Sequence, residues 1–352
     1  MTILEFPLGI DIHVHFRQPG GEYKETVETG YAAALAGGIG TVCDMPNTNP
    51  PIDNRHTLKE KERLLDPFPY IHQIIAITNS NVTNNELVKL ADKHSLFKVF
   101  MANSTGNIGI SKEHLYKAFE DLEAYQPTIM VHAEDPEMIK NRSEGCDENL
   151  VRPVDAEISA IERILNYVDD FPKINFHITH VSSPKGAELL VKQNRCSWDV
   201  LAKHLRFNAR AIEVKGNFAR MNPPLREEAD RMKLQQLLSE GKIPMVSSDH
   251  APHTKEDKKN QIAGAPGVQE LYPQMIDFYL RDIIDQTTLR KIIYDNPKTF
   301  LNRVALTHRK GTIRIDPDLT TEFNSSSIKS KVGWSLWEGI PLQGKIVSID
   351  LD

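Results

Sequence analysis

The chain repeats one kind of unit: a short apolar run rich in β-branched residues, a polar turn, and a stretch with helical periodicity. Eight such runs lie at residues 9–16, 40–46, 70–77, 96–102, 128–134, 174–181, 198–205 and 243–251. Several are apolar almost throughout, which is typical of parallel strands buried on both faces. Eight strands alternating with helices predict a (β/α)8 barrel, of the α/β class. The alternative is an open doubly wound sheet, but the first run lacks the Gly-x-Gly-x-x-Gly turn common in that fold.

The segments between these runs have a helical pattern, and the last part of the chain does not. Residues 27–36, followed by two glycines, and residues 155–167, with isoleucine at every third position, are examples. From about residue 311 the chain shows short alternating stretches instead. We therefore expect residues 1–305 to form the barrel and residues 306–352 to form a small β extension packed on it.

Charge and cysteine usage exclude several classes of protein. Lys and Arg number 42 against 48 for Asp and Glu, a net charge of −6, so the chain lacks the broad basic field that nucleic-acid binding needs. No apolar run approaches the ~20 residues that span a bilayer, and the first residues do not resemble a signal peptide. The three cysteines, an odd number, argue against a disulfide framework. We expect a soluble cytoplasmic protein that acts on a small molecule.

Polar side chains are found where these apolar runs end, which in such a barrel is where catalytic groups lie. The motif His13-x-His15 ends the first run, and its two imidazoles point to the same side of a strand. Two neutral imidazoles that converge in this way suit Zn²⁺ or a similar metal. Further candidate residues are Lys98 in the fourth run, His132 in the fifth, His180 in the sixth and Asp249 in the eighth.

Lys98 is unusual because its neighbours Phe97 and Val99 are apolar. Such a lysine extends to solvent, pairs with a carboxylate, or changes its chemistry. After losing its proton it could take up CO₂, and the resulting carbamate is an anionic ligand able to bridge two cations. The salt bridge and the carbamate both remain open at this stage.

Two further interpretations concern His180 and Asp249. His177 and His180 are three positions apart and would point to opposite sides of a strand, so we expect His180 to face the metals. His177 would then face the helix layer and be structural. Asp249 suits a metal ligand that also moves a proton to or from a bridging hydroxide, although a turn-capping aspartate is the alternative.

Seven segments together resemble one known family. They are DIHVHFRQPG (11–20), MPNTNPP (45–51), FKVFMANSTG (97–106), VHAED (131–135), HITHVSS (177–183), MNPPLR (221–226) and SSDHAPHT (247–254). In this combination and order they resemble the dihydroorotase family of the amidohydrolase superfamily, over about residues 9–305. The family's longer members have accessory strands before the His-x-His motif. Since His13 lies close to the N-terminus, we expect that half to be absent here and only the C-terminal extension to remain.

The resemblance implies a centre of two divalent metal ions, usually zinc. One ion would be bound by His13, His15 and Asp249 and the other by His132 and His180, with carbamylated Lys98 between them. It also implies substrate contacts by Arg17, Asn47, Asn222 and His253, and a loop with Ser104 and Thr105 that closes over substrate. An arginine fork matches a carboxylate, which agrees with the role of Arg17.

Three other residues receive weaker interpretations: His204, His250 and Gln18. His204 resembles a position near the metals in some relatives, and a structural role is favoured. His250 would point away from Asp249 and is not expected to be catalytic. Gln18 stands where many relatives have glutamate, and we expect a small effect on the neighbouring Arg17.

The activity implied by the resemblance is the interconversion of N-carbamoyl-L-aspartate with L-dihydroorotate and water, a step of pyrimidine biosynthesis. A metal-bridging hydroxide would attack the ring amide, with Asp249 as general acid and base. Another cyclic amidase, such as a hydantoinase, dihydropyrimidinase or allantoinase, is the first alternative. A non-catalytic subunit that scaffolds an aspartate transcarbamoylase is the second. Homodimers are common in the family, so the resemblance also implies a homodimer.

Overall fold

A computed structural model describes residues 3–103, 108–141, 147–193 and 195–352 of the chain. Ser104 and Thr105, expected in a loop over the substrate, lie outside these residues. Parallel strands follow one another along the chain in three short sheets. They are β2 (Gly9–Val14), β3 (Ile39–Asp44) and β4 (Ile71–Gln73); β5 (Ile75–Ile77), β6 (Leu96–Phe100), β7 (Thr128–His132), β8 (Asn175–Ile178) and β9 (Cys196–Trp198); and β10 (Val200–Leu201) with β11 (Val246–Ser247).

The three parallel sheets are consecutive parts of one strand order, because a single residue separates the last strand of one sheet from the first strand of the next. Ile74 alone separates β4 from β5, and Asp199 alone separates β9 from β10. A parallel bridge between Val14 and His250 then joins the chain just after β11 to β2. The parallel strands therefore run in sequence order from β2 to β11 and return to β2.

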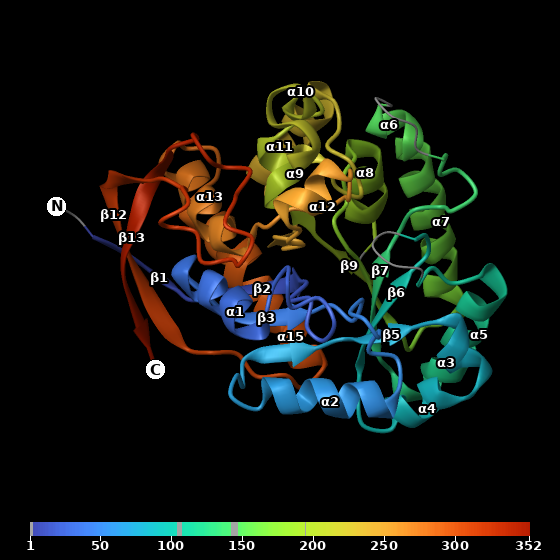
Figure 1. The fold of residues 1–352 in the computed structure, drawn as a ribbon. Helices are drawn as coiled ribbons and strands as arrows, with labels where there is room; N and C mark the ends of the chain where they lie inside the picture. The colour runs from blue at the N-terminus through green and yellow to red at the C-terminus, as the bar shows by residue number, and fades with distance from the viewer. Residues whose placement is uncertain (1–2, 104–107, 142–146, 194) are drawn as a thin grey trace.

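Helices follow most of the parallel strands along the chain and surround them (Figure 1). The longer ones are α1 (Val27–Ala36), α2 (Arg55–Leu65), α5 (Lys112–Leu122), α7 (Val154–Asp170), α8 (Pro184–Val191), α11 (Glu228–Ser239), α13 (Val268–Leu280) and α15 (Asn296–Arg303). The shorter ones are α3 (Asn79–Thr83), α4 (Glu86–Ala91), α6 (Glu148–Val151), α9 (Ala202–Arg206), α10 (Ala211–Lys215), α12 (Lys255–Lys259) and α14 (Gln286–Arg290), with 3₁₀ turns at Glu123–Tyr125 and Gly216–Ala219 and a π-helical turn at Lys291–Asp295. Within the described ranges, no helix has the length and apolar character needed to cross a membrane.

Local sequence explains where α1 begins and ends. The Thr26 side chain accepts a hydrogen bond from the backbone N–H of Thr29, and the Thr29 side chain accepts one from Thr26 in return. This reciprocal capping satisfies two N–H groups that the first turn of a helix leaves unpaired. Gly37 follows the last residue, and the helix has the bounds that the sequence predicts.

On β7 the two faces of the strand pack against different apolar clusters. On β7, Ile129 and Val131 belong to the large cluster shared with the surrounding helices. Met130 between them belongs to a smaller cluster with residues of β2, β3 and α15, including Ile10, Ile12, Cys43 and Phe300.

The predicted seventh strand, residues 198–205, is only partly a strand. It consists of Trp198, the last residue of β9, then Asp199, the short β10 and the first residues of α9. The segment Ala202–Arg206 carries alanine, lysine, leucine and arginine, which favour a helix, so the strand ends at Leu201.

The last two strands form a three-stranded antiparallel sheet together with the first described strand, β1 (Leu4–Pro7). The order of this sheet is β1, β12 (Gly311–Thr321) and β13 (Leu342–Leu351), and Leu4 pairs with Ile315. Figure 1 shows β1 beside β12 and β13, away from the parallel strands. The expectation that only the C-terminal segment remains of this sheet is therefore wrong, because β1 precedes His13 and belongs to the sheet. Four residues are too short a signal, and their partner lies at the other end of the chain.

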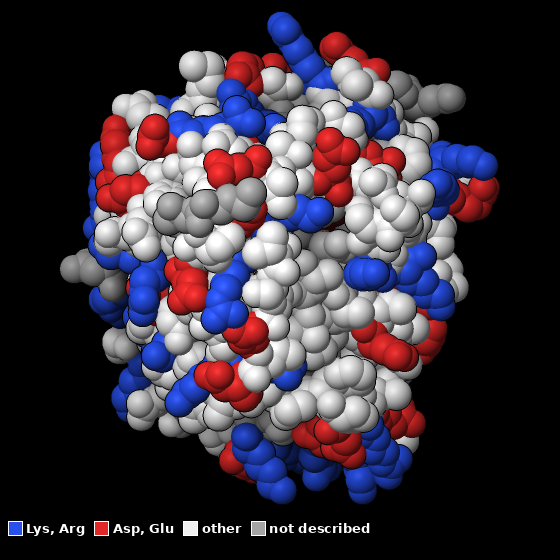
Figure 2. All heavy atoms as spheres, turned by 90° about the vertical axis from the view of Figure 1, so that its left-hand side faces the viewer, with Lys and Arg blue, Asp and Glu red and all other residues white. Residues whose placement is uncertain are grey.

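The face that carries this sheet has mixed charge. Figure 2 shows lysine and arginine side chains interspersed with aspartate and glutamate over this face, with no continuous basic surface. Arg314 of β12, for example, forms ion pairs with Glu5 and Asp350.

Candidate active site

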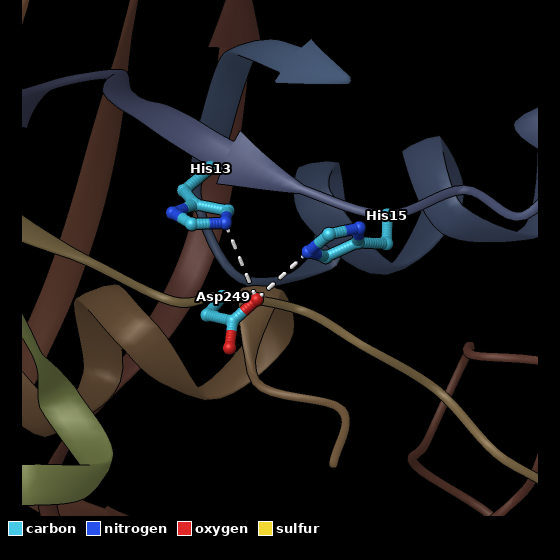
Figure 3. Close-up of side chains that lie close together, drawn as sticks. All are labelled: His13, His15 and Asp249. Carbon is cyan, nitrogen blue, oxygen red and sulfur yellow. Dashed lines mark hydrogen bonds and ion pairs between the residues drawn. The ribbon is translucent and has the colours of Figure 1, made fainter. Parts of the chain in front are cut away.

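His13, His15 and Asp249 lie together at the ends of β2 and β11, and all three are buried (Figure 3). Asp249 Oδ1 is 3.4 Å from His13 Nε2 and 2.9 Å from His15 Nε2. The bridge from Val14 to His250 and the hydrogen bond from His15 N to His250 O, 2.7 Å long, hold the two strand ends together. The three side chains form a group that could hold a metal ion, with one donor atom from each within 4.8 Å of the others.

His132 and His180 form a second pair beside the first group. His132 Nδ1 and His180 Nε2 are 2.9 Å apart, and the centroid of the His180 ring is 5.4 Å from that of His13. Burial, followed by nearby positive charge, lowers the pKa of His13 and His180 well below the usual range. Neutral imidazoles carry a free lone pair, so the donor set fits divalent metal ions.

Lys98 on β6 is fully buried, and its Nζ donates to Thr179 Oγ1 at 2.7 Å. Burial lowers its pKa to about 7, although Asp199 and Asp249 act in the opposite direction. Among the described residues, Lys98 forms no salt bridge with a carboxylate, which was one of the alternatives left open by the sequence. A lysine with this pKa is partly a neutral amine at neutral pH, which is the form that reacts with CO₂.

Glu134, supported by Arg152, contacts Nε2 of His132, whereas Nδ1 of the same ring faces His180. The sequence did not predict this role. Glu134 Oε2 is 2.7 Å from His132 Nε2, and Arg152 Nε donates to both carboxylate oxygens of Glu134 at 3.0 Å. Burial alone would raise the pKa of Glu134, but Arg152 and His132 hold it well below the usual range. A carboxylate behind a metal-ligating histidine fixes the ring and its tautomer. The only sequence signal was the position of Glu134 two residues after His132.

The expectation that His177 faces the helix layer is wrong. In the parallel sheet His177 lies in register with Met130 of β7, and Met130 with Lys98 of β6, so the His177 side chain is on the same side of the sheet as Lys98. Its Nε2 lies 2.8 Å from Asp199 Oδ2. The strand β8 ends at Ile178, and His180 follows with a positive φ of 46°. The alternation of sides stops where the strand stops, so both histidines reach the interior.

A small cavity brings most of the expected site residues together. It is lined by His13, His15, Arg17, Asn47, Phe100, His132, His180, Asn222, Asp249, Ala251, Ala263 and Gly264. Asn47 Oδ1 lies 2.5 Å from His15 Nδ1, so this residue also orients a histidine of the first group. Asn222 Oδ1 is buried and has no hydrogen-bond partner among the described residues, which leaves it free to bind a ligand.

Arg17 lines one side of this cavity, and His253 lies next to Arg17. Arg17 is buried, its Nε donates to Pro252 O at 3.2 Å, and burial lowers its pKa to about 10. The guanidinium is therefore still charged at neutral pH. His253 does not line the cavity but lies behind Arg17, with its Nε2 3.1 Å from Arg17 Nη2.

The residues with weaker interpretations lie outside the cavity. His204 Nε2 is 3.3 Å from Pro223 O, and His250 Nε2 is 3.3 Å from Glu25 Oε2. Gln18 contacts the start of α1, where its side chain accepts a hydrogen bond from the backbone of Val27. It is this helix, and not Arg17, that the Gln18 side chain supports.

Comparison with known proteins first identifies the broad family to which the chain belongs. Residues 6–296 match the model of the Amidohydrolase family, so the chain belongs to this family. It is similar to the protein named dihydroorotase in Thermococcus kodakarensis, with 35% identity over 345 residues, 96% of this chain and 80% of that protein. The dihydroorotase of Pyrococcus furiosus is 34% identical over 348 residues, 96% of this chain and 78% of that protein. Among the amidohydrolases the chain thus belongs with the dihydroorotases.

Comparison with solved structures shows which known proteins share this fold. The L-hydantoinase (dihydropyrimidinase) from Arthrobacter aurescens superposes with a TM-score of 0.90 at 23% identity, over 99% of this chain and 84% of that one. The dihydropyrimidinase from Brevibacillus agri gives a TM-score of 0.85 at 18% identity, over 99% and 83%. At these identities the likeness concerns the fold alone.

Proposed function

We propose that the chain is a dihydroorotase that interconverts N-carbamoyl-L-aspartate and L-dihydroorotate in pyrimidine biosynthesis. One observation carries the proposal: two groups of metal-type ligands and a buried arginine line the same cavity. A cyclic amide bearing a carboxylate needs both features. The relatives named dihydroorotase, at about a third identity over most of their length, support the same activity.

The donor set favours two divalent metal ions, most simply zinc. His13, His15 and Asp249 would hold one ion, and His132 with His180 the other. Lys98 would carry a carbamate between them, formed when its neutral amine attacks CO₂ and releases a proton. When bound, such ions supply a water nucleophile at neutral pH and polarise the carbonyl group that it attacks.

Asp249 would move the proton. Burial alone would raise its pKa, but His15 and Lys203 keep the pKa well below the usual range, so the group is a carboxylate. It would accept a proton from the attacking water and deliver it to the departing ring nitrogen. In the direction of ring closure the same carboxylate acts in reverse.

Arg17, Asn47, Asn222 and His253 would bind the substrate carboxylate and orient the ring. A fixed substrate turns the attack into an effectively intramolecular step. Ser104 and Thr105 stay a prediction as contacts of a closing loop.

The closed order of parallel strands supports a (β/α)8 barrel within residues 1–305, with the tail and β1 as an extension. We also propose a cytoplasmic enzyme. Homodimer formation and association with a transcarbamoylase stay predictions for size measurements on the purified protein.

An assay with three substrates tests the activity. We expect turnover of L-dihydroorotate and little turnover of dihydrouracil or hydantoin, whose rings lack the carboxylate that Arg17 would bind. Turnover of dihydrouracil without turnover of L-dihydroorotate would favour a dihydropyrimidinase instead. No turnover of any of them by metal-loaded protein would favour the non-catalytic scaffold.

A further inference from the structure

Three groups with hydrogen-bond donors meet next to the cavity, and of these Arg17 lines it. Nε2 of His253 is 3.1 Å from Arg17 Nη2, and Nδ1 of the same ring is 3.1 Å from Lys24 Nζ. His253 is fully buried, and the Lys24 side chain is 14% exposed. Lys24 does not line the cavity, so it reaches the site only through the imidazole.

The His253 ring is fixed in this orientation. Trp334 Nε1 donates to the backbone oxygen of His253 at 2.8 Å. Gly264 packs so closely that a Cβ atom there would lie 2.9 Å from His253 Cδ2. Both ring nitrogens therefore keep their separate neighbours, Arg17 on one side and Lys24 on the other.

The ring cannot accept from both neighbours. Burial, followed by the charges of Arg17 and Lys24, lowers the pKa of His253 well below its usual range, so the ring is neutral. A neutral imidazole has one acceptor nitrogen and one N–H, whereas lysine and arginine only donate. Asp257 Oδ2, at 3.7 Å from Nδ1, is too distant for a hydrogen bond and already accepts from Thr254. One of the two contacts is therefore between two donors.

We propose that Lys24 is a positioning residue that keeps Nδ1 of His253 as the acceptor, so that the Nε2–H group points to the side of Arg17 where the substrate carboxylate binds. A carboxylate oxygen there accepts from both Arg17 and Nε2–H, which removes the contact between two donors. Without Lys24, Nε2 is free to accept from Arg17, and the ring has no N–H left for the substrate. The inference rests on the proposed function because it assigns the carboxylate of that substrate.

Steady-state kinetics with L-dihydroorotate test this role. We expect Lys24→Met to raise KM about tenfold and to leave kcat within about twofold, because a ground-state contact is lost and no reacting atom is touched. Lys24→Arg keeps a cationic donor and should restore most of the affinity. Lys259→Met, at a lysine whose side chain is 74% exposed and pairs with Glu256, is the matched control and should resemble the unchanged protein. An unchanged KM in Lys24→Met, or equal KM increases in Lys24→Met and Lys24→Arg, would overturn the proposal.

Nitrogen-15 NMR of the imidazoles tests it without any turnover. The His253 signals are identified by their loss in His253→Gln. We expect Nδ1 to be unprotonated in the unchanged protein and Nε2 to be unprotonated in Lys24→Met. The same tautomer in both proteins would overturn the role of Lys24. If the unchanged protein does not convert L-dihydroorotate, the proposed function fails, and the NMR result still decides the role of Lys24.

Discussion

The ammonium group of Lys203 lies 2.8 Å from the backbone oxygen of Asp249, inside the protein and beneath the candidate site. The same Nζ donates at 2.8 Å to the backbone oxygens of Ser248 and Ala265. One buried cation thus ties the end of β11 to the start of the segment that leads into α13. All three donors of the ammonium are used, so Lys203 fixes the backbone from which Asp249 projects.

Lys203→Met should destabilise the fold. The methionine keeps much of the apolar stem but removes the Lys203 donor from the buried oxygens of Ser248 and Asp249, while Ala265 O still accepts from the backbone N–H of Ala251. We therefore expect the free energy of unfolding to fall by about 3 kcal/mol. Urea unfolding measures this. Lys259→Met, at the solvent-exposed lysine, should change it by less than about 0.5 kcal/mol. Equal stabilities of the two variants would show that the three contacts contribute nothing net.

Asp249→Asn should remove turnover while substrate binding stays measurable. The amide cannot accept the proton that the carboxylate takes, and we expect kcat to fall by at least about 100-fold. Calorimetry with L-dihydroorotate measures the binding that remains. Asp169→Asn, at a side chain 83% exposed, is the control. Turnover close to that of the unchanged protein would remove Asp249 from the mechanism.

Metal removal should abolish activity reversibly. Dialysis against a chelator is expected to stop turnover, and added Zn²⁺ should restore it with about two ions per chain, measured by elemental analysis. His132→Asn should lower the metal content, because it removes a ligand of the second pair. His56→Asn, whose side chain is 82% exposed, should not. Full activity after complete metal removal would contradict the proposed centre.

Carbamylation of Lys98 should be detectable as an increase in the mass of the protein. We expect intact-mass measurement of the metal-loaded protein, under conditions that preserve carbamates, to show one added CO₂. Lys98→Met should lose this addition together with metal. An unmodified Lys98 in active, metal-loaded protein would contradict the carbamate.

Acid should weaken the contribution of Glu134 to stability. Its pKa is held far below the ordinary value of 4.5, so the stability it gives is complete above that value and is lost as the pH falls toward the folded-state pKa. We expect the difference in unfolding free energy between the unchanged metal-free protein and Glu134→Gln to shrink by about 1 kcal/mol from pH 7 to pH 4. Glu137→Gln, at a side chain 69% exposed, should show no such change. A difference in unfolding free energy that stays constant between pH 7 and pH 4 for Glu134→Gln would contradict a lowered pKa of Glu134.

The sequence by itself determined the succession of parallel strands and the polar groups at their ends. Both are local signals: an apolar run shows a buried strand, and His13, His15, His132 and Asp249 break such runs where the strands finish. Once the strands are parallel and in order, their ends must meet, so the groups expected to share a site are brought together without knowledge of any contact.

Only the tertiary structure decided which other side chains hold these groups. The pairing of β1 with β12, the contact of Glu134 with His132 and the place of Lys203 under Asp249 depend on residues distant in the chain or on how a side chain turns. His177 shows the physical reason most clearly. The alternation of sides predicts an orientation only while the backbone stays extended, and β8 ends at Ile178, before His180. Where a strand stops is set by packing around it, and a single sequence does not record that packing.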